Sequence, residues 1–262
     1  MKRRTAVIAA TLVVLVTVTS VMAAHLYSQQ DSTVVKKLYQ PYVPSDDECI
    51  VVICFDDGWK SQLNASTVLD AFGFKATFGI VASYVGCPAY LSWDEIQALK
   101  EKGNDIESHS YSHIDFTNAS ENDIEYELSE SQKALSEKGI DSGVFIYPFG
   151  TGSENTTVRA DVQKYYLMAR ALEDEDYLDL AEFDRWSIPA FTILNNTSFD
   201  IFQNIVDNAG GTTIAVLVYH QIGTAGEYSI TQSDFAVQMA YLKSENFTIM
   251  TMSQLFLRNF KS

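Results

Sequence analysis

The sequence predicts an α/β fold with parallel strands, and three observations support this prediction. From residue 49 onward, apolar runs of strand length alternate with amphipathic segments of helical spacing, which is typical of a parallel barrel or a doubly wound sheet. The length of 262 residues, 47% of them hydrophobic, suits one large domain with a single core. Acidic and histidine side chains follow several of the predicted strands, at the positions where barrel proteins place their functional groups.

The first 24 residues are predicted to direct export. Lys2, Arg3 and Arg4 precede an apolar stretch that is as long as a membrane span, and small residues near its end suit a cleavage site. We expect residues 1–24 to be a cleaved signal peptide or an uncleaved membrane anchor. Because the basic residues stay in the cytoplasm, the domain is expected to be extracellular or at the cell surface. Residues 25–48 are polar and contain prolines, and are predicted to be a linker.

The first half of the domain begins with a continuous apolar run at 50–55, as expected for a strand buried on both faces of a parallel sheet. Helical spacing at 61–72 ends at a glycine, and a second strand is predicted at 76–81. Residues 92–102 start with Ser followed three residues later by Glu, a capping box that predicts a helix. A short strand is predicted at 105–108.

The second half continues the alternation. A long amphipathic helix is predicted at 121–138, and a strand at 144–147 is ended by a proline. Strands are expected at 165–169 and 186–188, on either side of an acidic loop. The last predicted elements are a helix at 199–208, a strand at 213–219, a helix at 233–243, a strand at 247–250 and a helix at 253–260.

The positions of polar motifs favour the barrel over the doubly wound sheet. Asp56 and Asp57 follow the first predicted strand, His109 the third, Pro148 the fourth and His220 a late one. In a barrel, the carboxyl ends of all strands meet at one face, where functional groups gather. Core packing gives no reason for such residues to follow four strands, so they are candidates for chemistry.

Two histidines and the carboxylate pair suit a metal ion. His109 and His113 are four residues apart, a spacing that on a helical turn puts both rings on one side of an ion. Ser110 follows the first histidine where a metalloprotease has Glu, so a general base must come from elsewhere. Of Asp56 and Asp57, one can complete the metal triad while the other stays free. The same donors also suit Fe(II), which keeps a non-haem iron oxygenase as an alternative.

Charge and cysteine content exclude some classes of protein. The net charge of −16 argues against a nucleic-acid partner and suits a neutral substrate. The three cysteines have no C-x-x-C spacing, so cysteine ligation of a metal is not expected.

In this order the motifs resemble those of the polysaccharide deacetylase family, the family 4 carbohydrate esterases with a NodB-type domain. Phe55-Asp56-Asp57-Gly58 is similar to the first motif, T-F-D-D-G, and His109-Ser110-Tyr111-Ser112-His113 to the second, H-S/T-x-x-H. Leu217-Val218-Tyr219-His220 resembles the late strand that ends in the catalytic histidine. The resemblance implies a distorted (β/α) barrel with fewer than eight full units, and makes residues 49–262 the catalytic domain.

The resemblance also implies roles for residues. Asp57, His109 and His113 would bind a divalent metal, most often Zn²⁺, with Co²⁺ or another divalent ion as alternatives. Asp56 would be the general base, and His220 the general acid that protonates the leaving amine. The implied function is metal-dependent hydrolysis of N-acetyl groups on an extracellular or cell-surface polysaccharide or oligosaccharide, with release of acetate.

The third motif departs from the family pattern R-x-P-Y. It reads Ile146-Tyr147-Pro148-Phe149, so the arginine that orients the base is absent, and this version resembles poly-N-acetylglucosamine-type deacetylases. The missing arginine leaves open an alternative, a non-catalytic glycan-binding protein on the same fold. The family's D-x-x-x-W segment has Asp184-Arg185-Trp186 as its nearest counterpart.

Three further residues are candidates for contact with the substrate. The backbone N–H of Phe149 is expected to stabilise the oxyanion that forms during hydrolysis. Tyr147 is expected either to pack or to contact the substrate. Trp59 directly follows the first motif and is expected to line the cleft, where an indole ring can stack on a sugar.

Overall fold

The computed structural model describes residues 44–45, 48–172 and 176–257, and the fold lies within one compact unit, Tyr42–Leu255. The leader predicted at residues 1–24 and most of the linker at 25–48 lie outside the described residues. Across the described part of the chain, no helix combines the length and the apolar character that crossing a membrane requires.

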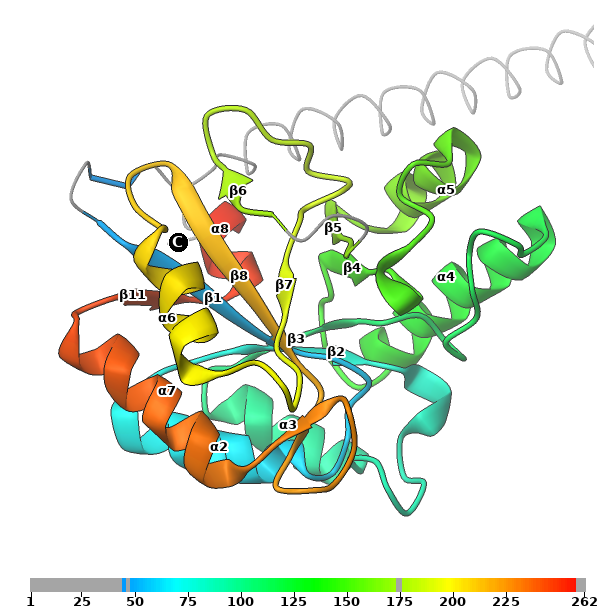
Figure 1. Ribbon diagram of the computed structural model, residues 1–262. Helices are drawn as coiled ribbons and strands as arrows, with labels where there is room; N and C mark the ends of the chain where they lie inside the picture. The colour runs from blue at the N-terminus through cyan, green and yellow to red at the C-terminus, as the bar shows by residue number, and fades with distance from the viewer. Residues whose placement is uncertain (1–43, 46–47, 173–175, 258–262) are drawn as a thin grey trace, which may run out of the picture. The chain divides into compact units, whose positions relative to one another are not determined.

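A curled sheet of nine strands forms the centre of the unit (Figure 1). Its strands are β1 (Ile50–Phe55), β2 (Thr77–Ile80), β3 (Asp105–Ser108), β4 (Val144–Ile146), β5 (Met168–Arg170), β6 (Leu178–Asp179), β7 (Phe191–Thr192), β8 (Thr213–Tyr219) and β11 (Thr248–Met250). Two short strands, β9 (Gln221–Ile222) and β10 (Ser229–Ile230), pair with each other in a separate parallel ladder.

The strand order explains the barrel. The order is β5-β4-β3-β2-β1-β8, with all of these neighbours parallel, and β11 pairs with the beginning of β1. Ile188 bridges to Arg170 on β5, while β7, three residues further on, pairs with β8. The segment 188–192 therefore joins the two ends of the curled sheet. The predicted distorted (β/α) barrel with parallel strands is confirmed; among the described strands of this sheet, only β6 is antiparallel.

Helices cover the outer surface of the sheet, α2, α3 and α7 on one side and α4 and α5 on another (Figure 1). The helices are α2 (Gln62–Phe72), α3 (Trp93–Glu101), α4 (Glu121–Ser136), α5 (Thr156–Tyr165), α6 (Phe199–Asp207), α7 (Gln232–Ser244) and α8 (Met252–Leu257), with short 3₁₀ turns η1 (Ala82–Tyr84) and η2 (Pro148–Gly150). The predicted capping box at Ser92 and Glu95 is present at the start of α3. The helices α4, α5, α6 and α7 each begin after a Ser, Thr or Asn whose side chain accepts a backbone N–H.

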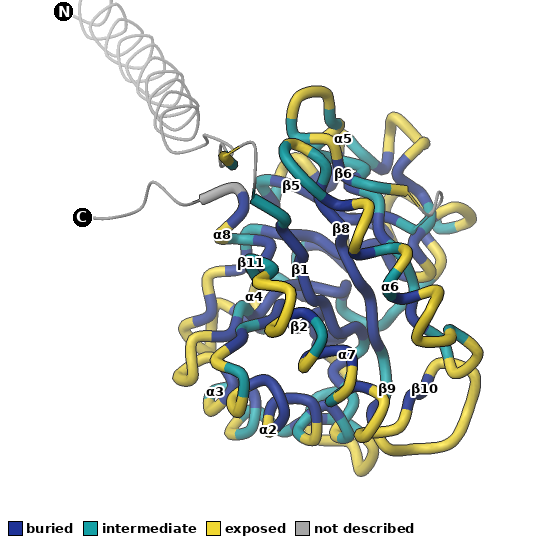
Figure 2. Tube along the Cα trace, turned by 60° about the vertical axis from the view of Figure 1, so that its left-hand side comes forward, coloured by how far each residue is buried: buried dark blue, intermediate teal, exposed yellow. Residues whose placement is uncertain are grey.

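Alternation along the strands separates packing residues from functional ones. Val51, Ile53 and Phe55 of β1 belong to the core cluster under α2, α3 and α7, and the rings of Phe55 and Phe78 stack at 5.0 Å. A second cluster, which includes Phe145, Tyr147 and Ala169, lies under α4 and α5. Because successive side chains of a strand point to opposite faces, the residues between these packing residues face the barrel interior. Figure 2 shows the strands as the buried centre of the unit.

Some predicted elements were wrong. Residues 156–165 form α5, for which no helix was predicted, and β5 begins at Met168 rather than at 165. Residues 186–188 form a turn with a single bridge, and the strand of this region is β7, Phe191–Thr192. The helix α5 opens with Thr-Thr-Val, residues of low helix propensity, so its clearest signal is Asn155, whose side chain accepts the N–H groups of Thr157 and Val158.

Candidate active site

The two carboxylates that follow β1 point in different directions because the chain turns sharply between them. Asp56 continues the inward-facing side of the strand and is 2% exposed. Asp57 has a φ of 74°, in the left-handed region, and Gly58 has the same φ. Asp tolerates this conformation better than most residues. As a result, Asp56 reaches into the barrel, and Asp57 faces the loop that carries the histidines.

Asp56 forms a buried ion pair with Arg170 of β5. Arg170 Nη2 lies 2.5 Å from Asp56 Oδ2, and the Arg170 side chain is fully buried. Burial raises the pKa of Asp56, but the charge of Arg170 together with those of His109 and His220 outweighs the effect of burial, and the pKa is lowered from its usual value. The other oxygen, Oδ1, has no hydrogen-bond partner among the described residues, so it is free to accept a proton.

Arg170 corrects the sequence analysis, which found no arginine to orient the base. The third motif, at the end of β4, has no arginine, but the neighbouring strand β5 supplies Arg170. Arg170 faces inward because its neighbours Ala169 and Ala171 face the outer cluster. The available signal was the alternation Ala169-Arg170-Ala171 around the end of this short strand. The strand predicted at 165–169 stopped one residue too early to include Arg170.

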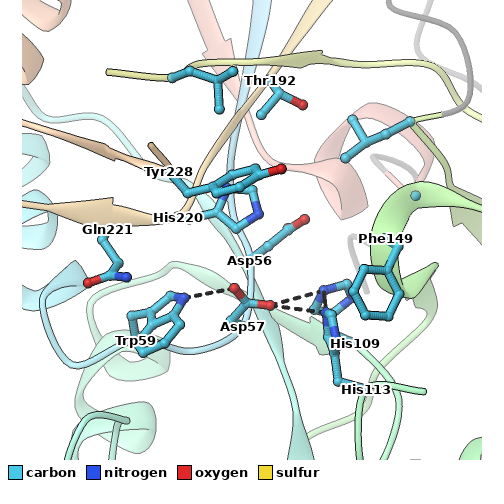
Figure 3. A pocket seen from close by; sticks show the side chains of 13 residues that line it. Asp56, Asp57, Trp59, His109, His113, Phe149, Thr192, His220, Gln221 and Tyr228 are labelled. Atoms are coloured by element: carbon cyan, nitrogen blue, oxygen red, sulfur yellow. Dashed lines mark hydrogen bonds and ion pairs between the residues drawn. The ribbon is translucent and has the colours of Figure 1, made fainter. Parts of the chain in front are cut away.

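Asp57, His109 and His113 bring three ligand atoms to one point (Figure 3). Asp57 Oδ1 lies 3.4 Å from His109 Nε2 and 3.2 Å from His113 Nε2, and the two Nε2 atoms are 3.2 Å apart. Zinc bonds of about 2.0–2.1 Å in a tetrahedron give ligand atoms about 3.3 Å apart. The donor set therefore fits a tetrahedral divalent ion in both chemistry and spacing.

The tautomer of His109 strengthens this fit. Its Nδ1 lies 2.9 Å from the backbone carbonyl of Ile146, so Nδ1 carries the proton and Nε2 presents a lone pair. Two ring nitrogens and a carboxylate oxygen that face one another repel unless a cation lies between them. Burial raises the pKa of Asp57, but its contacts with the imidazoles of His109 and His113 lower it overall, so this carboxylate stays ionised.

The histidine loop is a strained bend, and the helical turn assumed from its spacing is absent. Ser110 has a φ of 65° and His113 a φ of 61°. Ser110 Oγ accepts the N–H of His113 at 2.9 Å, and buried Glu127 of α4 accepts both the N–H (2.6 Å) and the hydroxyl of Ser112. A helix outside the sheet thus fixes the bend that aims both rings at Asp57.

Trp59 touches the metal triad directly. Its indole Nε1 donates to Asp57 Oδ2 at 2.7 Å, and its ring stacks on Tyr90 at 4.4 Å. The bond occupies one carboxylate oxygen and leaves Oδ1 for the histidines. Trp59 also lines the cavity, so contact with a substrate stays a prediction.

His220 follows β8 and lies across the cavity from the triad (Figure 3). Burial lowers its pKa, although the charges of Asp56 and Asp57 oppose the shift. Its Nδ1 has no hydrogen-bond partner among the described residues, and its ring packs edge-on against Tyr228, 5.0 Å away.

Asp184, the nearest counterpart of the aspartate in the family's D-x-x-x-W segment, forms an ion pair with Arg159.

One cavity of about 660 Å³ collects most of these side chains. Its lining comprises Asp56, Asp57, Trp59, His109, His113, Phe149, Gly150, Leu172, Thr192, Leu194, His220, Gln221 and Tyr228. No motif predicted that Leu172, Thr192, Leu194 and Tyr228 line this cavity. Apolar side chains such as Leu172 and Leu194 surround the polar side chains of the cavity, as in many small-molecule sites.

Phe149 and Tyr147, from the third motif, differ in placement. Phe149 has a φ of 58° and an exposed ring that packs edge-on against His113 at 4.6 Å. Among the described residues, no acceptor takes its backbone N–H.

Tyr147 is fully buried in the outer cluster, with its ring 5.1 Å from that of Phe145, and does not line the cavity. Strand alternation explains this, because Ile146 takes the inward position; the packing role is the one that fits.

The comparison with known sequences agrees with the motifs. Residues 44–168 match the family model described as polysaccharide deacetylase, a stretch that ends before β8 and His220. YxkH of Bacillus subtilis (strain 168), a candidate polysaccharide deacetylase by name, is 28% identical over 132 residues. That match covers 50% of this chain and 47% of the relative, so the chain spans about half the length of this relative. The resemblance to the family is confirmed.

Solved structures share the fold. The Xyl-CE4 domain of a multidomain xylanase from the hindgut metagenome of Trinervitermes trinervoides has a TM-score of 0.58 at 24% identity, covering 80% of this chain and 90% of that one. A family 4 carbohydrate esterase from Streptomyces lividans, solved with acetate, has a TM-score of 0.57 at 22% identity, covering 78% and 92%. A family 4 acetyl xylan esterase from Clostridium thermocellum, solved with cobalt, has 0.58 at 19%, covering 79% and 89%.

Proposed function

We propose that this chain is a metal-dependent hydrolase, which removes N-acetyl groups from a polysaccharide or oligosaccharide and releases acetate. The proposal takes as its premise that the chain belongs to the polysaccharide deacetylase family. The observation that carries the proposal is the meeting of two sets of groups in one cavity. A donor set that fits a tetrahedral divalent ion lies on one side, and an ionised carboxylate and an imidazole outside that set lie beside it.

The metal, Zn²⁺ or a similar divalent ion, would be held by Asp57, His109 and His113. When bound, such an ion polarises a carbonyl group and lowers the pKa of water towards about 7. The three ligands leave a position open, which distinguishes a catalytic site from a closed structural one.

The base and the acid would come from the remaining two groups. Asp56 Oδ1 accepts a proton from the water that adds to the acetyl carbon, and Arg170 holds the other oxygen of this carboxylate in place. His220 gives a proton to the amide nitrogen as the C–N bond breaks, so an amine and acetate leave. General acid–base catalysis of this kind typically contributes about 10²–10⁴-fold.

The wall of the cavity would position the acetyl group. The unused backbone N–H of Phe149 can donate to the oxygen that becomes negative, an interaction worth about 10²–10³-fold in rate. Leu172, Leu194 and Tyr228 offer apolar surface for the methyl group and the sugar ring. Among the described residues that line the cavity, none is a Lys or Arg, which suits a neutral substrate better than an anionic one.

The proposal includes the place of action. The basic residues and apolar stretch at the start of the chain support a substrate that is extracellular or at the cell surface, reached by a secreted or singly anchored protein. The alternative of a non-catalytic glycan-binding protein depended on a missing arginine. Arg170 occupies that role from β5, so the observation that favoured the alternative no longer holds.

Acetate release tests the proposal. The purified protein is incubated with N-acetylated and O-acetylated oligosaccharides, with Zn²⁺ or Co²⁺, before and after chelation. We expect release from an N-acetylated glycan that stops on chelation and returns with metal. Folded, metal-loaded protein that releases no acetate from any of these substrates would contradict the proposal and favour a binding protein.

A further inference from the structure

The side-chain amide of Gln62, in the first turn of α2, spans the ends of two adjacent strands. Its Nε2 donates to the backbone carbonyl of Asp56 at 2.6 Å and to that of His220 at 3.0 Å. The side chain is fully buried. One amide group therefore holds the main chain at both of the residues assigned to proton transfer.

This contact lies where the ladder between β1 and β8 ends. Phe55 pairs with Tyr219 as the last register pair, and the N–H of Asp56 donates to the carbonyl of Tyr219 at 2.9 Å. The carbonyls of Asp56 and His220 are one step further on, and buried carbonyls need donors. Gln62 supplies both donors, so it acts as one more rung between the two strands.

The chemistry of the amide allows only one orientation. If it were reversed, Oε1 would face two carbonyl oxygens and no donor would lie between the three acceptors. In the orientation present, Oε1 is buried without a partner among the described residues, which is unfavourable because the oxygen loses its hydrogen bonds to water. A residue that only filled space would not need this cost, since Met or Leu would pack there without a buried polar atom.

From this geometry we infer that Gln62 is a positioning residue that sets the spacing between the general base Asp56 and the general acid His220, an inference that rests on the function proposed above. The two groups serve opposite ends of the same amide bond, so their separation must match the substrate. A displacement of about 1 Å in such a site can cost about 10²-fold in rate.

The side chains of the metal triad have hydrogen bonds of their own that do not involve Gln62. Asp57 is held through Trp59, His109 through the carbonyl of Ile146, and the bend before His113 through its own hydrogen bonds. Loss of the Gln62 amide should therefore lower turnover while metal affinity stays unchanged. A general loss of structure would instead lower both.

Asn64 provides a matched control on the same helix. Its Nδ2 donates to the carbonyl of Ile222 at 3.0 Å, two residues beyond His220, so it ties α2 to the same segment by the same kind of bond. Asn64 contacts no group assigned to catalysis. Comparing Gln62→Met with Asn64→Ala separates positioning of the catalytic residues from general attachment of the helix.

The experiment measures kcat, KM, the metal dissociation constant and Tm for both variants with an N-acetylated oligosaccharide. We expect Gln62→Met to lower kcat by about 10–100-fold, with KM and metal affinity within about 2-fold of wild type. Asn64→Ala should leave kcat within about 2-fold. Gln62→Asn, which keeps the amide but is too short to reach both carbonyls, replaces Gln62→Met if that variant does not fold.

A double-mutant comparison adds a second readout. If Gln62 acts through His220, its substitution should cost less in a His220→Ala background than in wild type, whereas independent sites give additive losses. An undiminished loss in that background, a kcat of Gln62→Met close to wild type, or an equal loss in Asn64→Ala would overturn the inference. Failure of the proposed function would show differently, as absence of acetate release by the metal-loaded wild type.

Discussion

Two pairs of carboxyl groups, each with one buried and one partly buried member, lie on this sheet, and their surroundings push their pKa values in opposite directions. Asp56 and Asp57 follow the carboxyl end of β1, whereas Asp105 and Glu107 lie within β3. Burial raises the pKa in all four. Only the first pair has cationic or imidazole partners, and only there is the pKa lowered.

The pair in β3 is held by neutral donors. Glu107 accepts from the hydroxyl of Ser142 (2.8 Å), the N–H of Val144 (2.8 Å) and the hydroxyl of Ser253 (2.8 Å). Asp105 accepts the N–H of Ser253 at 3.0 Å. Burial and the charge of Asp105 raise the pKa of Glu107 well above its usual value, so a proton is retained there.

The comparison shows which feature marks a functional carboxylate in this molecule. Burial and proximity to another carboxylate are common to both pairs. The difference is Arg170 and the two histidines, which keep Asp56 and Asp57 ionised beside a cavity. The pair in β3, in which Glu107 retains a proton, instead connects β3, β4 and the start of α8, which is a structural task.

The largest expected effect follows from removing the cation of the first pair. Arg170→Met leaves Asp56 buried without a partner, which typically costs about 3–5 kcal/mol in stability. The lowered pKa of Asp56 gives stability that is present above about pH 4 and lost as the pH falls. In the variant this pKa rises, so we expect a lower Tm, and an acid limb of kcat that moves to higher pH. Unchanged unfolding and pH–rate profiles would refute the assignment.

A smaller effect is expected where a neutral donor supports the same pair. Trp59→Phe keeps the ring over Tyr90 but removes the N–H that holds Asp57 Oδ2, so metal affinity should fall by about 10–100-fold. Isothermal titration with Zn²⁺ measures it. Trp93→Phe, at the start of α3, is the matched control and should bind metal as wild type does. Equal affinities of the two variants would show that the indole bond does not tune the site.

The smallest effect is expected in the second pair. The raised pKa of Glu107 means that the stability given by its neutral form is present below about pH 4 and is lost as the pH rises through the raised pKa. Glu107→Gln removes that dependence, so Tm should vary less between pH 5 and 8 than in wild type, with kcat within about 2-fold. A large loss of kcat would mean that this pair serves the active site after all.

The elements that the sequence predicted best were those fixed by local apolar pattern. The strands at 50–55, 105–108 and 213–219 have the predicted bounds, because runs such as Ile50–Phe55 are buried along their length. Their ends also located Asp56, His109 and His220. Local pattern was sufficient here, since the residues that carry chemistry directly follow the buried runs.

The features that the sequence did not predict depend on contacts distant in the chain. Arg170 meets Asp56 across 114 positions, and Gln62 meets His220 across 158, so no motif spacing could reveal either. The choice between packing and substrate contact for Tyr147 stayed open because the direction of its side chain depends on which face of β4 the barrel closes over. The apolar wall at Leu172 and Leu194 comes from loops whose path is set only when segment 188–192 joins the ends of the sheet.

The most direct test compares the two adjacent carboxylates by conservative substitution. Asp56→Asn and Asp57→Asn are assayed in parallel for bound Zn²⁺ and for acetate release from an N-acetylated oligosaccharide. We expect Asp56→Asn to keep the metal and lose turnover by about 10²–10⁴-fold, and Asp57→Asn to lose the metal as well as turnover. Near wild-type turnover in Asp56→Asn, or full metal binding in Asp57→Asn, would contradict the division of roles on which the proposed reaction depends.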